Sequence, residues 1–156
     1  MGLFNKGEDA ANGIKRSLRK RGISADVTVY KGEAYATAED VFAPGTELFI
    51  SWAKKELSVT FSLGSNPALY SLSTGLVSEY NASGAPFSRA AMCQPSQVNS
   101  RDYHKVWIEG FMPGASIADK TDEVETFLDM ILEDIFDTHA SVMKRLFINA
   151  KLAALS

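Results

Sequence analysis

Residues 121–155 carry the sequence TDEVETFLDMILEDIFDTHASVMKRLFINAKLAAL, the longest amphipathic pattern in the chain. Its apolar side chains recur at intervals of three and four residues, the spacing of a helix that buries one face. No proline or glycine interrupts the pattern. We therefore predict a long C-terminal helix over residues 121–155, which, if it is continuous, is roughly 50 Å long at about 1.5 Å per residue.

A helix of this length exceeds what a small domain usually covers, so part of its apolar stripe is expected to contact a partner chain. We predict a single α+β domain over residues 1–156, in which residues 137–156 form a helical extension. This surface indicates binding and assembly rather than catalysis. The side chains assigned to the partner surface are Ile135, Val142, Met143, Leu146 and Phe147.

The rest of the chain alternates between strand and helix patterns. The order α-β-β-β-α-β-β-α, with the long C-terminal helix last, predicts an antiparallel sheet with packed helices, an α+β fold. The expected elements before that helix are a helix at 8–21, a strand at 26–31 continued at 35–37, a hairpin of strands at 48–52 and 59–63, a helix at 67–80, and strands at 87–93 and 105–112.

Composition places the chain among small globular proteins. Its 156 residues, 46% of them hydrophobic, suffice for one core. A single cysteine, Cys93, excludes an internal disulfide and fits a reducing compartment. The start of the chain lacks a signal-peptide pattern, and no window has the apolar length of a membrane span. We therefore expect a cytoplasmic protein.

The charge is small overall but uneven along the chain. A net charge of −3 argues against a dedicated nucleic-acid binder. Residues 1–31 hold seven Lys or Arg against three acids, whereas residues 119–137 hold eight acids against Lys120. Either both segments are solvated helix faces, or the basic turn docks against the acidic stripe, in its own subunit or in another. The basic cluster, which is also a candidate contact for phosphate or an anionic membrane surface, comprises Lys15, Arg16, Arg19, Lys20 and Arg21.

Catalytic and cofactor signatures are absent from the sequence. It has none of the glycine-rich phosphate or dinucleotide motifs, and no cluster of residues at metal-ligand spacing, so neither a cofactor nor a metal is expected. His139 lies near the apolar stripe, where it is either a pH-sensitive contact between helices or a partly exposed structural histidine. One alternative to a binding protein is an enzyme whose site assembles in space on the loop 94–104, from Arg101, Asp102 and His104. Another is a nucleic-acid or membrane-surface adaptor that uses the basic N-terminal helix.

Two stretches resemble the YbjN family, whose fold is that of type III secretion chaperones. The first is GLVSEYNASGAPFSRAAM at residues 75–92, and the second is VWIEGFMP at 106–113 with the helix pattern that follows at 119–135. The resemblance implies a small, acidic, often dimeric bacterial protein that binds other proteins or acts in regulation, without enzymatic activity. We therefore expect a non-enzymatic, chaperone-like homodimer that holds a protein partner or client segment.

Overall fold

The computed structural model describes residues 2–54, 56–64, 69–84, 86–92, 105–111 and 121–155. It contains both helices and strands, which confirms the α+β class. The helices are α1 (Gly2–Lys20), α2 (Tyr70–Ala82), the 3-10 turn η2 (Thr121–Glu123), α3 (Val124–Glu133), the π-helical turn η3 (Asp134–Thr138) and α4 (Ala140–Ala154). The strands are β1 (Asp26–Tyr30), β2 (Glu33–Glu39), β3 (Thr46–Ala53), β4 (Glu56–Gly64), β5 (Ser88–Met92) and β6 (Lys105–Phe111).

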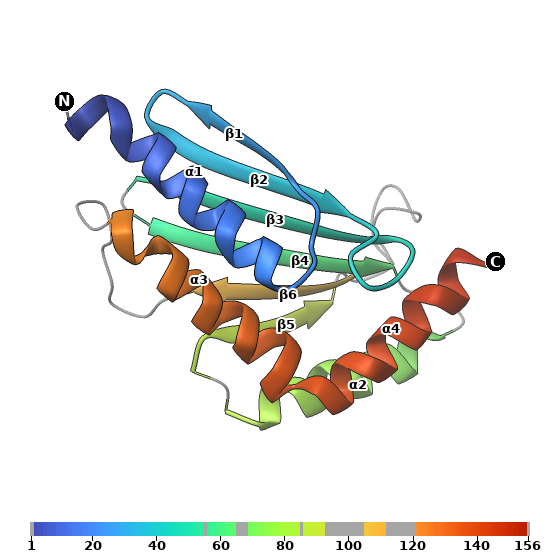
Figure 1. Cartoon of the computed structure of the whole chain (residues 1–156). Coiled ribbons are helices and arrows are strands. Elements are labelled where there is room, and N and C mark those ends of the chain that lie inside the picture. The colour runs from blue at the N-terminus through green and yellow to red at the C-terminus, as the bar shows by residue number, and fades with distance from the viewer. Residues whose placement is uncertain are drawn as a thin grey trace.

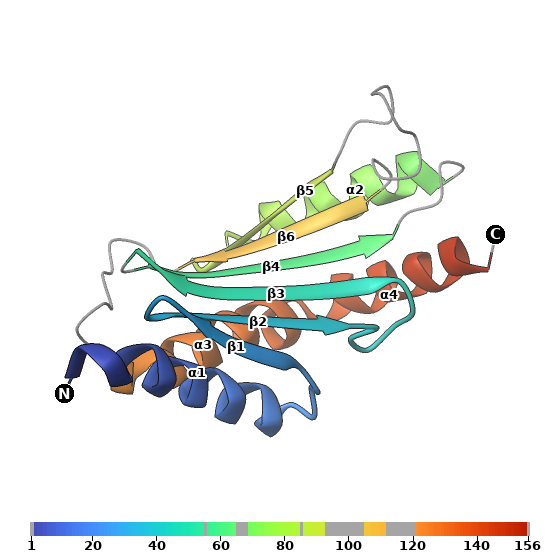
Figure 2. The ribbon, with the colours of Figure 1, turned by 90° about the horizontal axis from the view of Figure 1, so that it is seen from above.

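The strands form one antiparallel sheet in the order β1-β2-β3-β4-β6-β5. Helices α1, α3 and α4 lie together on one side of this sheet (Figures 1 and 2). Helix α2 packs beside the edge strand β5 and also contacts α4. The core therefore lies between the sheet and the three helices, and α2 closes it at the β5 edge.

The central hairpin has the two-residue alternation that the sequence predicts. In the register Leu48 is opposite Phe61 and Ile50 is opposite Val59, and all four side chains are buried. The intervening residues point to the other side, where Phe49 is 43% exposed. Alternation of this kind is typical of a sheet with one face on the core and one in water.

The predicted number of strands is one too low, because the segment expected as a single interrupted strand is a hairpin. Tyr30 pairs with Glu33, so only Lys31 and Gly32 form the turn between β1 and β2. Both turn residues have positive φ, 51° and 75°. A two-residue turn with positive φ at both positions matches the twist of the strands it joins, and glycine adopts that backbone without strain.

The long C-terminal helix expected over residues 121–155 is present, but it is not one continuous α-helix. The segment is helical almost throughout, but η3 interrupts the α-helical pattern, and His139 has φ −103° and ψ 24°. The chain consequently bends between α3 and α4 (Figure 1). Each piece then packs on the sheet of its own subunit, so the length argument for a partner surface no longer holds.

Helix α4 packs on the core of its own subunit over most of its length, and residues 151–155 at its end are largely exposed. It contacts β4 and α2. Its side chains Met143, Leu146 and Ala150 are each 1% exposed. The bend between α3 and α4 thus brings the end of the chain back over the sheet.

Candidate binding pocket

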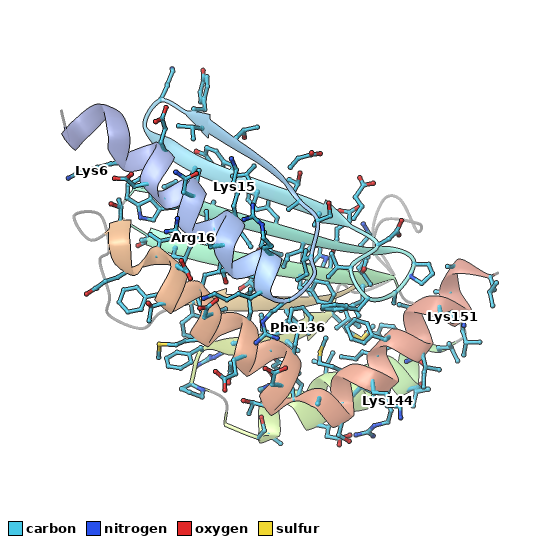
Figure 3. All side chains as sticks on the ribbon, viewed as in Figure 1. Lys6, Lys15, Arg16, Phe136, Lys144 and Lys151 are labelled. Carbon is cyan, nitrogen blue, oxygen red and sulfur yellow. The ribbon has the colours of Figure 1, made fainter. Side chains whose placement is uncertain are left out.

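A pocket of about 980 Å³ opens beside the bend between α3 and α4. Three parts of the chain enclose it: the end of α1, the loop between β2 and β3, and the inner side of the bend. Figure 3 places Phe136 between the end of α1 and this bend. Its apolar lining consists of Phe42, Ala43, Pro44, Phe136, Ala140, Met143, Phe147 and Ile148, and its charged lining consists of Lys20, Arg21, Asp129, Glu133, Asp137, Lys144 and Lys151.

Aromatic rings form one wall of the pocket and the core behind it. Phe136 and Phe147 stack on each other, with ring centres 6.4 Å apart. Both rings meet the fully buried Phe61 of β4 edge to face, at 5.1 and 6.0 Å. Phe42 contacts the same two rings from the pocket side, at 5.3 and 6.2 Å. Edge-to-face packing of this kind holds rings in fixed orientations, which gives the wall a defined shape.

The loop that carries Phe42 is held by hydrogen bonds to Asp40 and Thr46. The Asp40 N–H donates to the Thr46 carbonyl at 2.7 Å, and the Gly45 N–H donates to Asp40 Oδ1 at 2.9 Å. Thr46 Oγ1 lies 2.9 Å from the Val41 carbonyl oxygen. Within this loop Phe42 has φ 64° and is 53% exposed. A bulky residue in the left-handed region is a genuine outlier, and here it holds an aromatic ring at the pocket edge.

The basic turn of α1 docks against the acidic stripe of α3 and η3 in the same subunit, as one of the two predictions proposed. Arg16 Nε lies 2.5 Å from Glu125 Oε1, and Lys20 Nζ lies 2.5 Å from Glu125 Oε2 and 2.7 Å from Asp129 Oδ2. Arg21 binds Asp137 with both terminal nitrogens, the shorter distance being 2.9 Å. Three members of the predicted anion-binding cluster therefore already have carboxylate partners from the protein itself.

The other two members of that cluster lie elsewhere on α1. Lys15 and Arg19 are exposed and line a depression of about 390 Å³ between α1 and β1. Figure 3 shows Lys15 on α1, far from Lys144 and Lys151 on α4. The five cations of the basic cluster are thus not gathered at one site.

The ion pairs between α1 and the acidic stripe predict a loss of stability in acid. Hydrogen bonds from Lys20 and Arg16 hold the pKa of Glu125 below its ordinary 4.5, and Arg21 holds that of Asp137 below its ordinary 3.8. A carboxylate whose pKa is lower in the folded than in the unfolded protein stabilises the fold above the ordinary pKa, and this contribution is lost as pH falls through the folded value. We expect the free energy of unfolding to decrease from about pH 4.5 downward, as measured by urea unfolding.

Two variants identify the groups responsible for this acid sensitivity. Glu125→Gln and Asp137→Asn should each reduce the pH dependence below about pH 4.5, because the titrating partner of the cation is gone. Glu133→Gln is the control, since within the described part of the chain Glu133 has no cation partner. An equal reduction of the pH dependence in all three variants would contradict the assignment.

The residues predicted to bind a partner lie in the core of their own subunit, and this corrects the prediction. Ile135, Val142, Met143 and Leu146 are between 0% and 5% exposed. Their apolar stripe faces the sheet because the bend lets α3 and α4 both follow it. Only Phe147 is half-buried, at the pocket wall.

A second, exposed apolar stripe lies on another side of α4. It consists of Ile148, Leu152 and Leu155, which are 51%, 48% and 76% exposed. These residues follow each other at intervals of four and three, so they share one side of the helix. Ile148 lines the pocket, and the stripe therefore begins at the pocket and continues to the end of the helix.

A buried polar network fixes the bend from the side of α2 and β5. The Ser88 hydroxyl donates to Asp134 Oδ2 at 2.5 Å, and Tyr80 and Ser88 share a hydrogen bond of 2.5 Å. Because the only proton of Ser88 goes to Asp134, the Tyr80 hydroxyl is the donor to Ser88. Burial raises the pKa of Tyr80 well above its ordinary 10.0, which keeps that proton in place.

His139 connects the same network to the end of α2. Its Nδ1 lies 2.6 Å from the Asp134 carbonyl oxygen and its Nε2 lies 2.7 Å from Ser83 Oγ. A carbonyl only accepts, so Nδ1 carries a hydrogen. The ring is 4% exposed and stacks on Tyr80 with ring centres 3.8 Å apart. Of the two interpretations of His139, the partly exposed one is wrong, because this side chain lies between the bend and α2.

The alternative catalytic site lies outside the described residues, which include neither Arg101, Asp102 and His104 nor Cys93. In the ranges that the structure describes, no three His, Cys, Asp or Glu side chains form a group that could hold a metal ion. Nor does any helix within those ranges have the length and apolar character needed to cross a bilayer.

A scan of protein-family models finds no match for this chain, and no curated protein matches it either. Its function must therefore be inferred from its own residues, among which the lining of the pocket is the most informative group.

Proposed function

We propose that the protein is a non-enzymatic, chaperone-like binding module that holds an apolar segment of a partner protein in the pocket beside the bend. The observation that carries the proposal is Phe42. A half-exposed phenylalanine in a left-handed backbone conformation costs of the order of 1–3 kcal/mol, which the surrounding structure must offset. Such a residue is more readily understood as a contact for a ligand than as a contribution to the fold.

The walls of the pocket also support binding rather than chemistry. Its described lining contains no Ser, Thr, Cys or His side chain. Four of its charged side chains are engaged in two ion pairs, Lys20 with Asp129 and Arg21 with Asp137. The apolar part consists of aromatic and long aliphatic side chains, which are the usual anchors of protein contacts. A volume of about 980 Å³ accommodates several side chains of a bound segment.

The resemblance of residues 75–92 and 106–113 to the YbjN family supports the same class of function, and a homodimer is part of the proposal. The exposed stripe of Ile148, Leu152 and Leu155 is the surface on α4 that a second copy or a client would cover. Light scattering during size-exclusion chromatography measures the oligomeric state. If the protein is a monomer at all concentrations, the homodimer is excluded from the proposal, and only the binding of a partner segment remains.

Replacing Phe42 separates binding from stability. Asparagine tolerates the left-handed backbone and lacks the ring, so Phe42→Asn should keep the fold while it removes an anchor from the pocket. The control is Phe49→Thr, which removes a ring of similar exposure from the open face of the sheet and keeps a residue suited to a strand. Thermal unfolding verifies that both variants are folded.

The measurement is affinity capture from cells that produce the protein, with wild type, Phe42→Asn and Phe49→Thr immobilised at equal density. We expect specific proteins that wild type and Phe49→Thr retain and that Phe42→Asn loses. The proposed function would be contradicted if all three proteins retained the same partners, or if Phe49→Thr lost them and Phe42→Asn kept them. It would also be contradicted if wild type retained no specific protein.

A further inference from the structure

We infer that the segment held in the pocket is an acidic amphipathic helix of a partner protein, with two carboxylates seven residues apart on either side of an apolar side chain. In this arrangement the carboxylates pair with Lys144 and Lys151, and the apolar side chain contacts Ile148 and the aromatic wall. The inference rests on the proposed function, because it names the partner of the same pocket.

Helix α4 carries cations without acids. Its sequence ASVMKRLFINAKLAA contains Lys144, Arg145 and Lys151 and no Asp or Glu. Arg145 is paired with Glu79 of α2. No acidic partner is present for Lys144 or Lys151 within the described residues, in contrast to Arg16, Lys20 and Arg21 of α1. Two unpaired cations at the rim of one apolar pocket favour a ligand that supplies negative charge.

The spacing of the two lysines defines the ligand more closely. Seven residues are close to two turns of helix, so Lys144 and Lys151 lie on one side of α4, roughly 10 Å apart along its axis. Figure 3 shows both along this helix. Ile148 lies between them on the same side, 51% exposed. A partner helix alongside α4 with carboxylates at the same seven-residue interval presents an apolar residue to Ile148 from the intervening turn.

The acidic wall of the pocket opposite α4 restricts where the carboxylates of a ligand can bind. It carries Asp129, Glu133 and Asp137, of which Asp129 and Asp137 are neutralised by Lys20 and Arg21. Glu133 is exposed and would repel an acidic ligand placed on that side. Charge complementarity therefore directs the carboxylates of the ligand to α4, and the apolar side of the ligand to Phe42 and Phe136.

A peptide probe tests this inference directly. The probe is a fluorescently labelled helical peptide of about 18 residues, or five turns, with glutamates seven apart that flank a leucine or phenylalanine. A second peptide has lysines in place of these glutamates. Binding is followed by fluorescence anisotropy at low and at moderate ionic strength, since charge pairs at a solvated rim weaken as salt screens them.

Charge reversal in the protein provides the matched comparison. We expect the acidic peptide to bind wild type, and Lys144→Glu with Lys151→Glu to weaken it by about tenfold. The lysine peptide should bind this double variant better than it binds wild type. The control is Lys15→Glu with Arg19→Glu, which makes the same change in net charge on α1 and should leave both affinities unchanged.

Three results would overturn the inference: equal binding of the acidic peptide to wild type and to the α4 double variant, an equal loss in the α1 control, or no binding at all. None of these affects the capture experiment with Phe42→Asn. If capture depends on Phe42 but the acidic peptide fails, the pocket holds a protein segment of different chemistry. If capture is independent of Phe42, the proposed function fails on its own.

Discussion

Replacing Asp134 by alanine should lower the free energy of unfolding by about 2–4 kcal/mol. The Asp134 side chain is 4% exposed and accepts the Ser88 hydroxyl, which in turn accepts the Tyr80 hydroxyl. Without the carboxylate, the Ser88 hydroxyl loses its acceptor in a buried site, and the hydrogen bond between Tyr80 and Ser88 loses its support. An unsatisfied buried donor carries its full desolvation penalty. Urea unfolding at pH 7, monitored by circular dichroism, gives the value.

A neighbouring aspartate serves as the matched control. Asp137→Ala makes the same chemical change three residues further on, but Asp137 is exposed and its ion pair with Arg21 lies at the surface, so the expected loss is below about 1 kcal/mol. Asp134→Asn keeps an oxygen that can accept from Ser88 and should cost less than the alanine variant. Equal losses for Asp134→Ala and Asp137→Ala would show that the network does not hold the bend.

The second large effect is expected for Gly110→Ala in β6, about 1–3 kcal/mol of destabilisation. A Cβ atom at Gly110 would overlap Ile131 Cγ2 of α3 and would lie 3.3 Å from Val59 Cβ and 3.4 Å from Ile135 Cδ1. Ile131 and Val59 are branched at Cβ and fully packed, so neither side chain can rotate away. Helix α3 must then move away from the sheet, and the loss is measurable by thermal or urea unfolding.

Gly75 provides a control at which the same substitution, glycine to alanine, should have the opposite effect on stability. It lies inside α2 with no atom within 4 Å of an added Cβ. Alanine is the better helix former by about 0.8–1.0 kcal/mol, so Gly75→Ala should stabilise the protein. If Gly110→Ala were as stable as wild type while Gly75→Ala was stabilised as expected, α3 would not pack as closely on β6 as the structure has it.

The hydrophobic periodicity of the sequence was sufficient to predict the fold class and most of the helices and strands. Alternation at Leu48, Ile50 and Phe61 predicted the central hairpin and its buried face, because each of these strands has one side in water and the other on the core. The turn at Lys31 and Gly32 was missed. Lysine is not a typical residue at positive φ, and only the glycine signalled a turn.

The bend between α3 and α4 could not be predicted from local sequence. Residues 134–139 contain no Pro or Gly, and their apolar spacing fits an uninterrupted helix. The bend coincides with contacts to residues far away in the chain, since Ser88 binds the Asp134 side chain and Ser83 binds His139. A tertiary hydrogen-bond network of this kind leaves no pattern in a single segment.

The candidate site was predicted only in part, and for related reasons. The pairing of Arg16 and Lys20 with acids of α3 was one of the two alternatives that the uneven charge left open. The pocket depends on the bend, so Phe136, Lys144 and Ile148 could not be assigned to a site before the bend was known. Phe42 did carry a signal, because an aromatic residue just before Ala43-Pro44-Gly45 is unusual in a turn.

The central claim, that the pocket beside the bend binds an acidic helical segment, is tested most directly by nuclear magnetic resonance. Isotope-labelled protein is titrated with the acidic peptide, and backbone amide shifts are mapped onto the sequence. The account predicts shifts concentrated at residues 42–43 and 144–152. Shifts centred on Phe49 and Trp107 at the open face of the sheet, or no shifts at a saturating peptide concentration, would contradict it.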